Sequence, residues 1–342
     1  MKSLNKNPLI SILVPCYKST EFIHRTIDSV LAQTYSNWEL ICVDDCSPDN
    51  TFDVLCDIAK SDSRIRVFRA DKNNGKAAPT LNLCVNKSCG DFIALLGHDD
   101  ELSPDYLEKS VARYLETGAD IIIPDAVFFF ENNPEKNWTM AGIVEKFGKD
   151  NNVVDRSVIL SGCEAVMLSL DWRIHAWAIF SSSIVKKHMF CEYGMNGDEY
   201  SSREFFLDAN KIAFSDGKYL YHQVETSITK KMSPKRFDTW NCDWRIENLL
   251  KENNFPKKII RKFNRKRFNT YVSQVRLYRK NYESFTDEER QLIESHLNLS
   301  LQHLSIYKVW YDYIFRKEKY GYKRVLVFLN FIKITYTHKG NK

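Results

Sequence analysis

The residues best suited to chemistry begin with two adjacent carboxylates, Asp44 and Asp45, which directly follow the apolar run 40–43. A carboxylate at the end of a strand can accept hydrogen bonds from the N–H and hydroxyl groups of a nucleoside. Asp side chains also commonly cap a turn or the start of a helix. Taken by itself, the pair favours the capping role over the binding role.

A second acidic cluster, Asp99–Glu101, follows the apolar run 92–96 after Gly97 and His98. Three adjacent acids repel one another unless a cation neutralises them, and hard divalent cations such as Mg²⁺ or Mn²⁺ prefer carboxylate oxygens. A metal bound here could hold a diphosphate as a leaving group. A solvated acidic turn before the helix expected near Pro104 is an equally good interpretation.

The first hundred residues alternate between short apolar runs and helical patterns. Strands are expected at Ile10–Pro15, Leu40–Val43, Val67–Arg69 and Phe92–Leu96, and helices at Glu21–Gln33, Thr51–Ala59 and Pro79–Val85. This alternation predicts an α/β fold with a mostly parallel sheet flanked by helices. Ligands bind beyond the C-terminal ends of such strands, where both acidic clusters and Pro15–Tyr17 fall.

The middle of the chain continues the alternation less regularly. We expect a helix at Asp105–Glu116, strands at Ile121–Pro124, Ile179–Val185 and Lys211–Asp216, and a loop or lid at Glu131–Asp155. An acidic segment, Asp198–Asp208, lies between the last two of these strands.

The composition, 44% hydrophobic and 27% charged, excludes a disordered or fibrous protein. No apolar run reaches the roughly 18 residues that suggest a membrane span, and Met1–Pro8 lacks the apolar core of a signal peptide. The nine cysteines show no metal-ligand spacing and indicate reduced thiols. We therefore expect a cytoplasmic protein.

Charge divides the chain into two parts. Residues 1–230 hold 24 Lys and Arg against 33 Asp and Glu, whereas residues 231–342 hold 25 against 11 and become helical from Pro234. We expect two units with different partners. Lys257–Arg267 interleaves basic and apolar residues, as does a helix on an anionic membrane surface, and Tyr320–Tyr336 is similar. The alternative is a solvated helix whose apolar side packs on the protein.

Five motifs then occur in order: Ile10–Tyr17, Thr26–Tyr35, Trp38–Asp49, Asn74–Gly75 and Gly90–Leu102. Together they resemble the nucleotide-sugar domain of family-2 glycosyltransferases, strongly over residues 8–125 and more weakly to about 230. The resemblance implies a GT-A fold, with a Rossmann-like mixed sheet in a catalytic domain over 1–230 and a basic, mainly helical C-terminal region over 231–342.

The resemblance also implies an activity. Such an enzyme would move a sugar, with inversion, from a nucleotide-sugar donor to a hydroxyl group of a glycan or lipid-linked acceptor. It would be a hexosyltransferase acting in capsule, O-antigen or exopolysaccharide synthesis. The basic C-terminal helices would place it at the inner face of the plasma membrane as a peripheral protein.

On the donor side, the resemblance implies that Pro15 and Tyr17 contact the nucleotide base. Asp45 would accept a hydrogen bond from a uracil-like ring, which makes UDP the preferred nucleotide. Lys76 would supply a positive charge near the donor, because the Arg that often follows Asn74–Gly75 in the family is absent.

The metal position follows from the same resemblance. Asp99 and Asp100 would contact the ribose and a diphosphate bound to Mn²⁺ or Mg²⁺. Gly97 stands where the family usually has the first Asp of its DxD motif, so metal dependence is expected but not required. His222 is the candidate for a histidine that approaches the metal or diphosphate.

Two further groups complete the expected site. Glu199, or its neighbour Asp198, would be the catalytic base that takes a proton from the acceptor, with Glu199 slightly favoured; the alternative is an acid that stabilises a helix start. Trp172, His175 and Trp177 would lie in the acceptor pocket, where aromatic faces stack on sugars, although Trp is at least as often a core residue.

Three other functions are weighed against this one. A non-catalytic GT-A scaffold that binds membrane or a partner gains support from Gly97. A sugar-phosphate nucleotidylyltransferase would need a Gly-rich phosphate loop, whereas Pro15–Lys18 contains no glycine. No motif for nucleic-acid binding is present.

Overall fold

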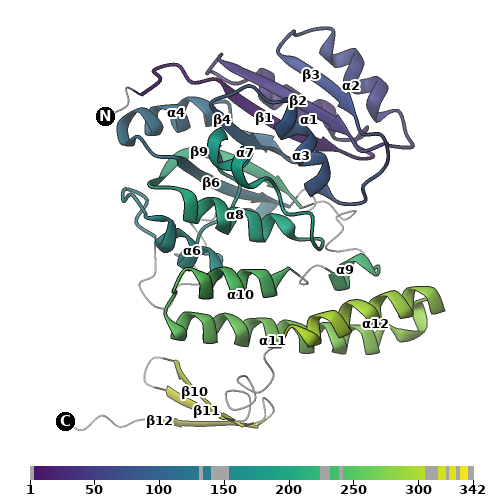
Figure 1. Ribbon diagram of the computed structural model, residues 1–342, viewed down its shortest axis with the longest axis vertical. Coiled ribbons are helices and arrows are strands. Elements are labelled where there is room, and N and C mark those ends of the chain that lie inside the picture. Colours follow the sequence, from purple (N-terminus) through teal and green to yellow (C-terminus); the bar gives the residue numbers. More distant parts are fainter. Residues whose placement is uncertain are drawn as a thin grey trace. The chain divides into compact units, whose positions relative to one another are not determined.

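The computed structural model describes residues 4–130, 134–139, 154–223, 232–238 and 242–304, and the backbone of three strands between 315 and 337. It divides into two compact units, Met1–Lys231 and Met232–Lys342 (Figure 1). Most of the expected loop at Glu131–Asp155 lies outside the described residues.

Four parallel strands form the first half of the main sheet, in the order β3-β2-β1-β4. They are β1 (Ile10–Cys16), β2 (Trp38–Asp44), β3 (Ile65–Arg69) and β4 (Phe92–Leu95). The helices between them are α1 (Ile23–Leu31), α2 (Thr51–Ala59) and α3 (Ala77–Lys87). The strands and helices expected from the sequence are therefore confirmed here, with ends that shift by at most two residues.

The second half of the sheet is mixed, with the order β4-β8-β6-β9-β5. Its strands are β5 (Glu101–Leu102), β6 (Ile121–Phe129), β8 (Ile179–Ser181) and β9 (Ile212–His222), and β7 (Trp138–Thr139) pairs with β6. Parallel pairing joins β6 to β9, whereas β8 is antiparallel to both of its neighbours. Helices α4 (Tyr106–Thr117), α6 (Gly162–Leu170), α7 (Ser182–His188) and α8 (Gly197–Asp208) complete the unit.

Three expected strands have different limits in the structure. The strand expected over Ile121–Pro124 continues to Phe129. The strand expected over Ile179–Val185 ends at Ser181, because the backbone N–H and hydroxyl of Ser182 donate to the Asp91 and Gly90 carbonyls and the chain turns into α7. The strand expected over Lys211–Asp216 instead continues to His222. The pairing of this strand with β6 shifts register near Asp216–Gly217, two residues that favour a turn, and the strand then continues beyond them.

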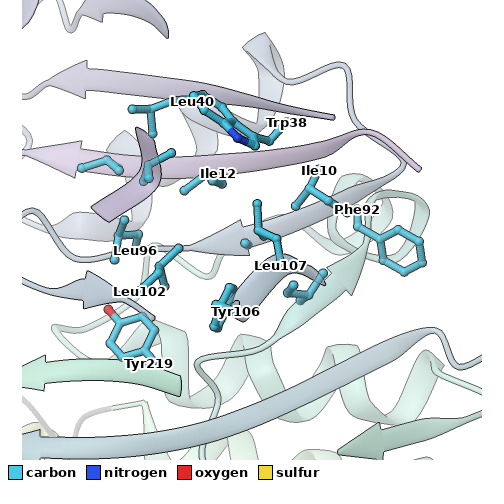
Figure 2. Close-up of a cluster of buried hydrophobic side chains, with 14 of the residues drawn as sticks. Ile10, Ile12, Trp38, Leu40, Phe92, Leu96, Leu102, Tyr106, Leu107 and Tyr219 are labelled. Atoms are coloured by element: carbon cyan, nitrogen blue, oxygen red, sulfur yellow. The ribbon is translucent and has the colours of Figure 1, made fainter. Parts of the chain in front are cut away.

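A single core of buried side chains joins the two halves of the sheet. Figure 2 shows part of it, with residues of β1, β2 and β4 packed toward Tyr106, Leu107 and Tyr219. The ring of Tyr219, on β9, is 1% exposed. Burial of this apolar surface fixes where the C-terminal ends of β1, β2 and β4 lie.

The described residues of the second unit between 235 and 302 are mainly helical. Its helices are α9 (Lys235–Asp238), α10 (Asp243–Glu252), α11 (Lys257–Lys280) and α12 (Asp287–Gln302). The apolar side of α11 lies inside this unit, with Phe263 and Tyr278 buried, while Asn264 and Arg267 contact Glu247 of α10. Among the residues that the structure describes, no helix combines the length and apolar character that crossing a membrane requires.

The helical character expected for Tyr320–Tyr336 is wrong. The backbone there forms an antiparallel sheet of β10 (Phe315–Tyr320), β11 (Lys323–Phe328) and β12 (Ile332–Thr337). The physical reason lies in residue type, because both later strands are rich in β-branched and aromatic side chains, which favour extended backbone. The second unit is thus helical with a terminal sheet.

Candidate functional site

The expected site residues of the first hundred positions lie at one edge of the sheet. The parallel register pairs Pro15 with Val43 and Leu13 with Leu95, so β1, β2 and β4 end side by side. Tyr17 follows β1 with its side chain 40% exposed, and Pro15 is partly buried. An accessible aromatic ring beside these strand ends suits contact with a flat base.

Asp44 and Asp45 have different environments although they are adjacent. Asp44 is fully buried; it accepts the Ser47 N–H and lies 3.2 Å from Arg69 Nε. It caps the turn, which confirms for this residue the structural role that the sequence allowed. Asp45 points instead toward the start of α3.

The Asp45 carboxylate organises the Asn74–Gly75 segment. Its Oδ1 accepts the Asn74 Nδ2–H at 2.6 Å and the Thr80 hydroxyl at 3.0 Å, and both oxygens share the Asn74 backbone N–H. A carboxylate has about four acceptor positions, so Oδ2 retains capacity for a further donor. Asp45, which is 5% exposed, therefore orders this segment and keeps acceptor capacity on Oδ2.

Asp100 is held in place from β9. Its Oδ2 accepts the Tyr219 hydroxyl at 2.6 Å and its Oδ1 accepts the His222 backbone N–H at 2.9 Å, while the Tyr219 oxygen accepts the Gly97 N–H at 3.0 Å. Burial, and then the neighbouring charge of Asp99, raise the Asp100 pKa to about 7, although these two donors oppose the shift. Asp99 itself is half-buried.

The glycine at position 97 has a steric consequence. A Cβ placed there would lie 2.5 Å from Asp100 Oδ2 and 3.1 Å from Asp99 Oδ1. The Asp100 carboxylate thus occupies the space that a side chain at 97 would enter.

His222 lies in the same region but faces a carboxylate. Its Nε2 is 2.7 Å from Glu101 Oε1, which is also 3.4 Å from Arg25 Nε, and a second Arg25 nitrogen donates to the Asp99 carbonyl at 2.8 Å. Among the described residues, no three His, Cys, Asp or Glu side chains converge as a metal site. The oxygen-rich donor set therefore fits a cation that takes one or two ligands from the protein and the rest from diphosphate and water.

Asp198 and Glu199 open helix α8 and also differ from each other. Glu199 Oε2 lies 2.6 Å from a guanidinium nitrogen of buried Arg203, which also donates to the Ser169 carbonyl. Asp198 has a solvent-exposed surface, yet the surrounding protein removes much of its hydration. This desolvation, and then the Glu199 charge, raise the Asp198 pKa to about 6.

Tyr221 shows that the two acidic regions are near each other. The charges of Asp100, Asp99 and Asp198 all act on this phenol, and with burial as the largest cause they raise its pKa to about 12. The charges of both acidic regions therefore reach the same phenol. Lys76, expected near the donor, contacts a loop of the protein: its Nζ donates to the Glu192 carbonyl at 3.3 Å.

The three aromatic candidates for an acceptor pocket are not alike. Trp172 is 45% exposed after α6. His175 is buried; its Nε2 bonds the Pro124 carbonyl, and burial lowers its pKa to about 3, so the ring is neutral. Trp177 is half-buried and stacks on Tyr219 and Tyr221, at 5.3 and 4.8 Å between ring centroids. His175 and Trp177 thus pack the protein, and Trp177 supports the tyrosine that holds Asp100.

Residues 11–169 match the family model described as Glycosyl transferase family 2. This segment, just under half of the chain, is similar to that family. The match includes the strand ends that carry Asp45, Asp99 and Asp100, and it stops before α8. The base candidates and the second unit therefore lie outside the family match.

Relatives support the same family. Glycosyltransferase GlyG of Streptococcus pneumoniae is 28% identical over 233 residues, which cover 65% of this chain and 73% of GlyG. TuaG of Bacillus subtilis, provisionally described as a teichuronic acid biosynthesis glycosyltransferase, is 39% identical over 112 residues, covering 33% of this chain and 44% of TuaG. The chain thus spans less than half of TuaG.

The fold has a solved counterpart. The structure of S. aureus TarS 1-349 in complex with UDP-GlcNAc superposes with a TM-score of 0.63 at 15% identity, covering 96% of this chain and 99% of that chain. The likeness confirms the GT-A fold expected from the sequence. The superposed residues come from both units, whereas the family match covers only part of the first.

Proposed function

We propose that this family-2 domain is an inverting glycosyltransferase that moves a hexosyl group from a UDP-sugar to a hydroxyl group of a glycan or lipid-linked acceptor in surface polysaccharide synthesis. The observation that carries the proposal is that the ends of β1, β2 and β4 lie side by side, so Asp45, Asp99 and Asp100 follow one edge of the sheet within the family-2 match. The charge of Asp198 acts on the same Tyr221 phenol as the charges of Asp99 and Asp100. A diphosphate-binding turn and a base must be adjacent for a single displacement.

The donor half would bind the nucleotide at the ends of β1 and β2. Tyr17 and Pro15 would contact the base, and Asp45 Oδ2 would accept its ring N–H. Support for uridine comes from this acceptor geometry and from the UDP-GlcNAc in the TarS complex. Lys76 contributes to this half by holding the loop before α8 rather than by meeting phosphate.

We propose that the catalytic base is Asp198. Glu199 is neutralised by Arg203 and stabilises the helix, whereas Asp198 is accessible and its raised pKa strengthens it as a base while leaving it ionised at neutral pH. Its carboxylate would take the proton of the acceptor hydroxyl as that oxygen attacks the anomeric carbon. The bond to the diphosphate oxygen breaks, and UDP leaves with the electron pair.

Mn²⁺ or Mg²⁺ is the cofactor that fits this site. Asp99 would hold it, and Asp100 and His222, which contact each other through the His222 N–H, would support the turn beside it. When bound, such a cation supplies positive charge that stabilises the leaving diphosphate. Arg25 and Tyr219 keep this turn in place whether or not the cation is bound.

A peripheral position at the inner face of the plasma membrane is part of the proposal. Its support is the exposed basic surface of α11, including Lys257, Lys258 and Arg261. Because Phe263 and Tyr278 are packed inside the unit, the contact would be electrostatic. Flotation with vesicles of phosphatidylglycerol, compared with a variant in which these three basic residues are changed to Glu, tests it.

The enzymatic proposal is tested by measuring UDP release from UDP-glucose, UDP-galactose, UDP-GlcNAc and UDP-GalNAc, with and without Mn²⁺. Release from at least one donor, with no trapped covalent glycosyl-enzyme, is expected. Binding of UDP without turnover of any donor would favour a non-catalytic scaffold.

A further inference from the structure

Asn82, on helix α3, reaches a loop that lies more than a hundred residues later in the chain. Its Oδ1 accepts the Phe190 N–H at 2.7 Å, and its Nδ2 donates to the Phe190 carbonyl at 3.0 Å. The same Nδ2 lies 2.8 Å from Glu192 Oε1. One amide thus satisfies both backbone groups of a single residue, as a neighbouring strand would, and fixes that residue in two directions.

The other side of this loop is held by α8. The Ser201 hydroxyl accepts the Cys191 N–H at 2.7 Å and donates to the Gly197 carbonyl at 3.0 Å. A Cβ on Gly197 would collide with the Cys191 carbonyl oxygen, so the loop lies directly on the first turn of α8. The position of residues 190–192 therefore determines the position of the helix start that carries Asp198.

Helix α3 is also fixed to the donor side. The buried Thr80 hydroxyl donates to Asp45 Oδ1 at 3.0 Å, two residues before Asn82. Lys76, just before α3, makes a further bond to the Glu192 carbonyl. A continuous series of hydrogen bonds thus runs from Asp45 through α3 and the loop 190–192 to the start of α8.

We propose that Asn82 is a positioning residue that fixes Asp198 relative to the nucleotide by holding the loop 190–192 against α3. The inference rests on the proposed function, because it assumes that α8 carries the base. A helix start displaced by about 1 Å can cost on the order of 100-fold in rate without weakening ground-state binding.

The test compares Asn82→Ala with Asn86→Ala, a matched change at an exposed position of the same helix. Asn82→Ala is expected to lower kcat for UDP release by about tenfold or more, with the KM for the sugar donor and the calorimetric Kd for UDP unchanged. Asn86→Ala is expected to leave all three unchanged. A merely structural role would change binding and rate together.

A second variant retains part of the contact. Asn82→Asp keeps an acceptor for the Phe190 N–H but loses the donor and faces Glu192 with a like charge; adding Glu192→Gln supplies a donor across the pair. We expect the double variant to recover part of the kcat that Asn82→Asp loses. Wild-type kcat in Asn82→Asp, or no recovery of a lost kcat in the double variant, would overturn the inference.

Hydrogen exchange gives a readout that needs no turnover. Asn82→Ala is expected to speed amide exchange over 190–200 while leaving 44–47 unchanged, and equal exchange in variant and wild type would overturn the inference. The two proposals fail differently. If Asp198→Asn keeps wild-type kcat, the assigned base is wrong; if it loses kcat while Asn82→Ala does not, only the positioning role is wrong.

Discussion

The two acidic pairs of the site, Asp99–Asp100 and Asp198–Glu199, follow the same arrangement in different settings. In each pair one carboxylate is held by the protein: Asp100 by Tyr219 and a backbone N–H, and Glu199 by Arg203. The other carboxylate of each pair is more accessible. Adjacent acids cannot both be free in one site without strong repulsion, so one of each pair supports the fold and the other remains for the ligand.

The settings differ in what does the holding. A buried neutral phenol and an amide hold Asp100, whereas a buried guanidinium neutralises Glu199. Within the described part of the chain, no cationic side chain pairs with the Asp100 carboxylate, so the first pair leaves its oxygens for a cation, whereas the second pair keeps one basic carboxylate, which suits proton transfer. The predictions below separate the two pairs.

The largest effect is expected from Asp198→Asn, which removes the proposed base. We expect kcat for UDP release to fall by about 10²-fold or more, with the Kd for UDP unchanged. Glu199→Gln, the matched change one residue on, is expected to cost less than about tenfold, because Arg203 already neutralises that carboxylate. The reverse order would assign the base to Glu199.

The pH dependence follows from the same carboxylate. Since the Asp198 pKa is raised to about 6, the base is ionised above that pH and protonated below it. We expect kcat to be level above pH 7 and to fall about tenfold per pH unit below about 6. A wild-type kcat that stays level down to pH 5 would contradict the assignment. In Asp198→Asn, the fall in kcat below about pH 6 should be absent.

A smaller effect is expected from Asp99→Asn on cation-dependent binding. Calorimetry should show that Mn²⁺ lowers the Kd for UDP in the wild type. In Asp99→Asn, we expect the Mn²⁺-dependent gain in UDP affinity to be about tenfold smaller. Asp57→Asn, at an exposed position of α2, is the control and should bind like the wild type. If Mn²⁺ changes UDP binding equally in Asp99→Asn, the cation is held elsewhere.

The smallest effect is expected from Tyr219→Phe, which keeps the ring in the core and removes the hydroxyl between Gly97 and Asp100. We expect a loss of roughly 1–2 kcal/mol in the free energy of unfolding and a few-fold weaker Mn²⁺-dependent UDP binding. The control is Tyr106→Phe. Tyr106 lies in the same core, its buried hydroxyl has no partner among the described residues, and its removal should cost nothing.

Equal destabilisation by Tyr219→Phe and Tyr106→Phe would show that the hydroxyl contact with Asp100 is unimportant. The two acidic pairs would then differ only in how deeply their carboxylates are buried.

Local pattern was sufficient to predict the first half of the sheet and the residues at its strand ends. Apolar runs and helical spacing identify β1 to β4, and the rule that ligands bind at C-terminal strand ends identifies Asp45 and Asp99. Asp44 shows the limit of that reasoning, because sequence alone does not tell a capping carboxylate from its neighbour.

The residues that the sequence did not indicate all act across long separations. Tyr219 contacts Asp100 from 119 positions away, and Asn82 contacts Phe190 from 108. Neither lies in a spacing pattern, because what places it is the packing of the sheet and helices. The C-terminal sheet has another cause: its basic residues are typical of a membrane-facing helix, whereas the β-branched and aromatic residues of β11 and β12 favour extended backbone.

The central claim is tested most directly by measuring UDP release from the panel of UDP-sugars in the presence of Mn²⁺. The wild type and Asp198→Asn are compared, and the Kd for UDP of each protein is measured by calorimetry. The account predicts turnover of at least one donor by the wild type and a loss of about 10²-fold in the variant at unchanged UDP affinity. Wild-type protein that binds UDP but releases none from any donor, or a variant as fast as the wild type, would contradict it.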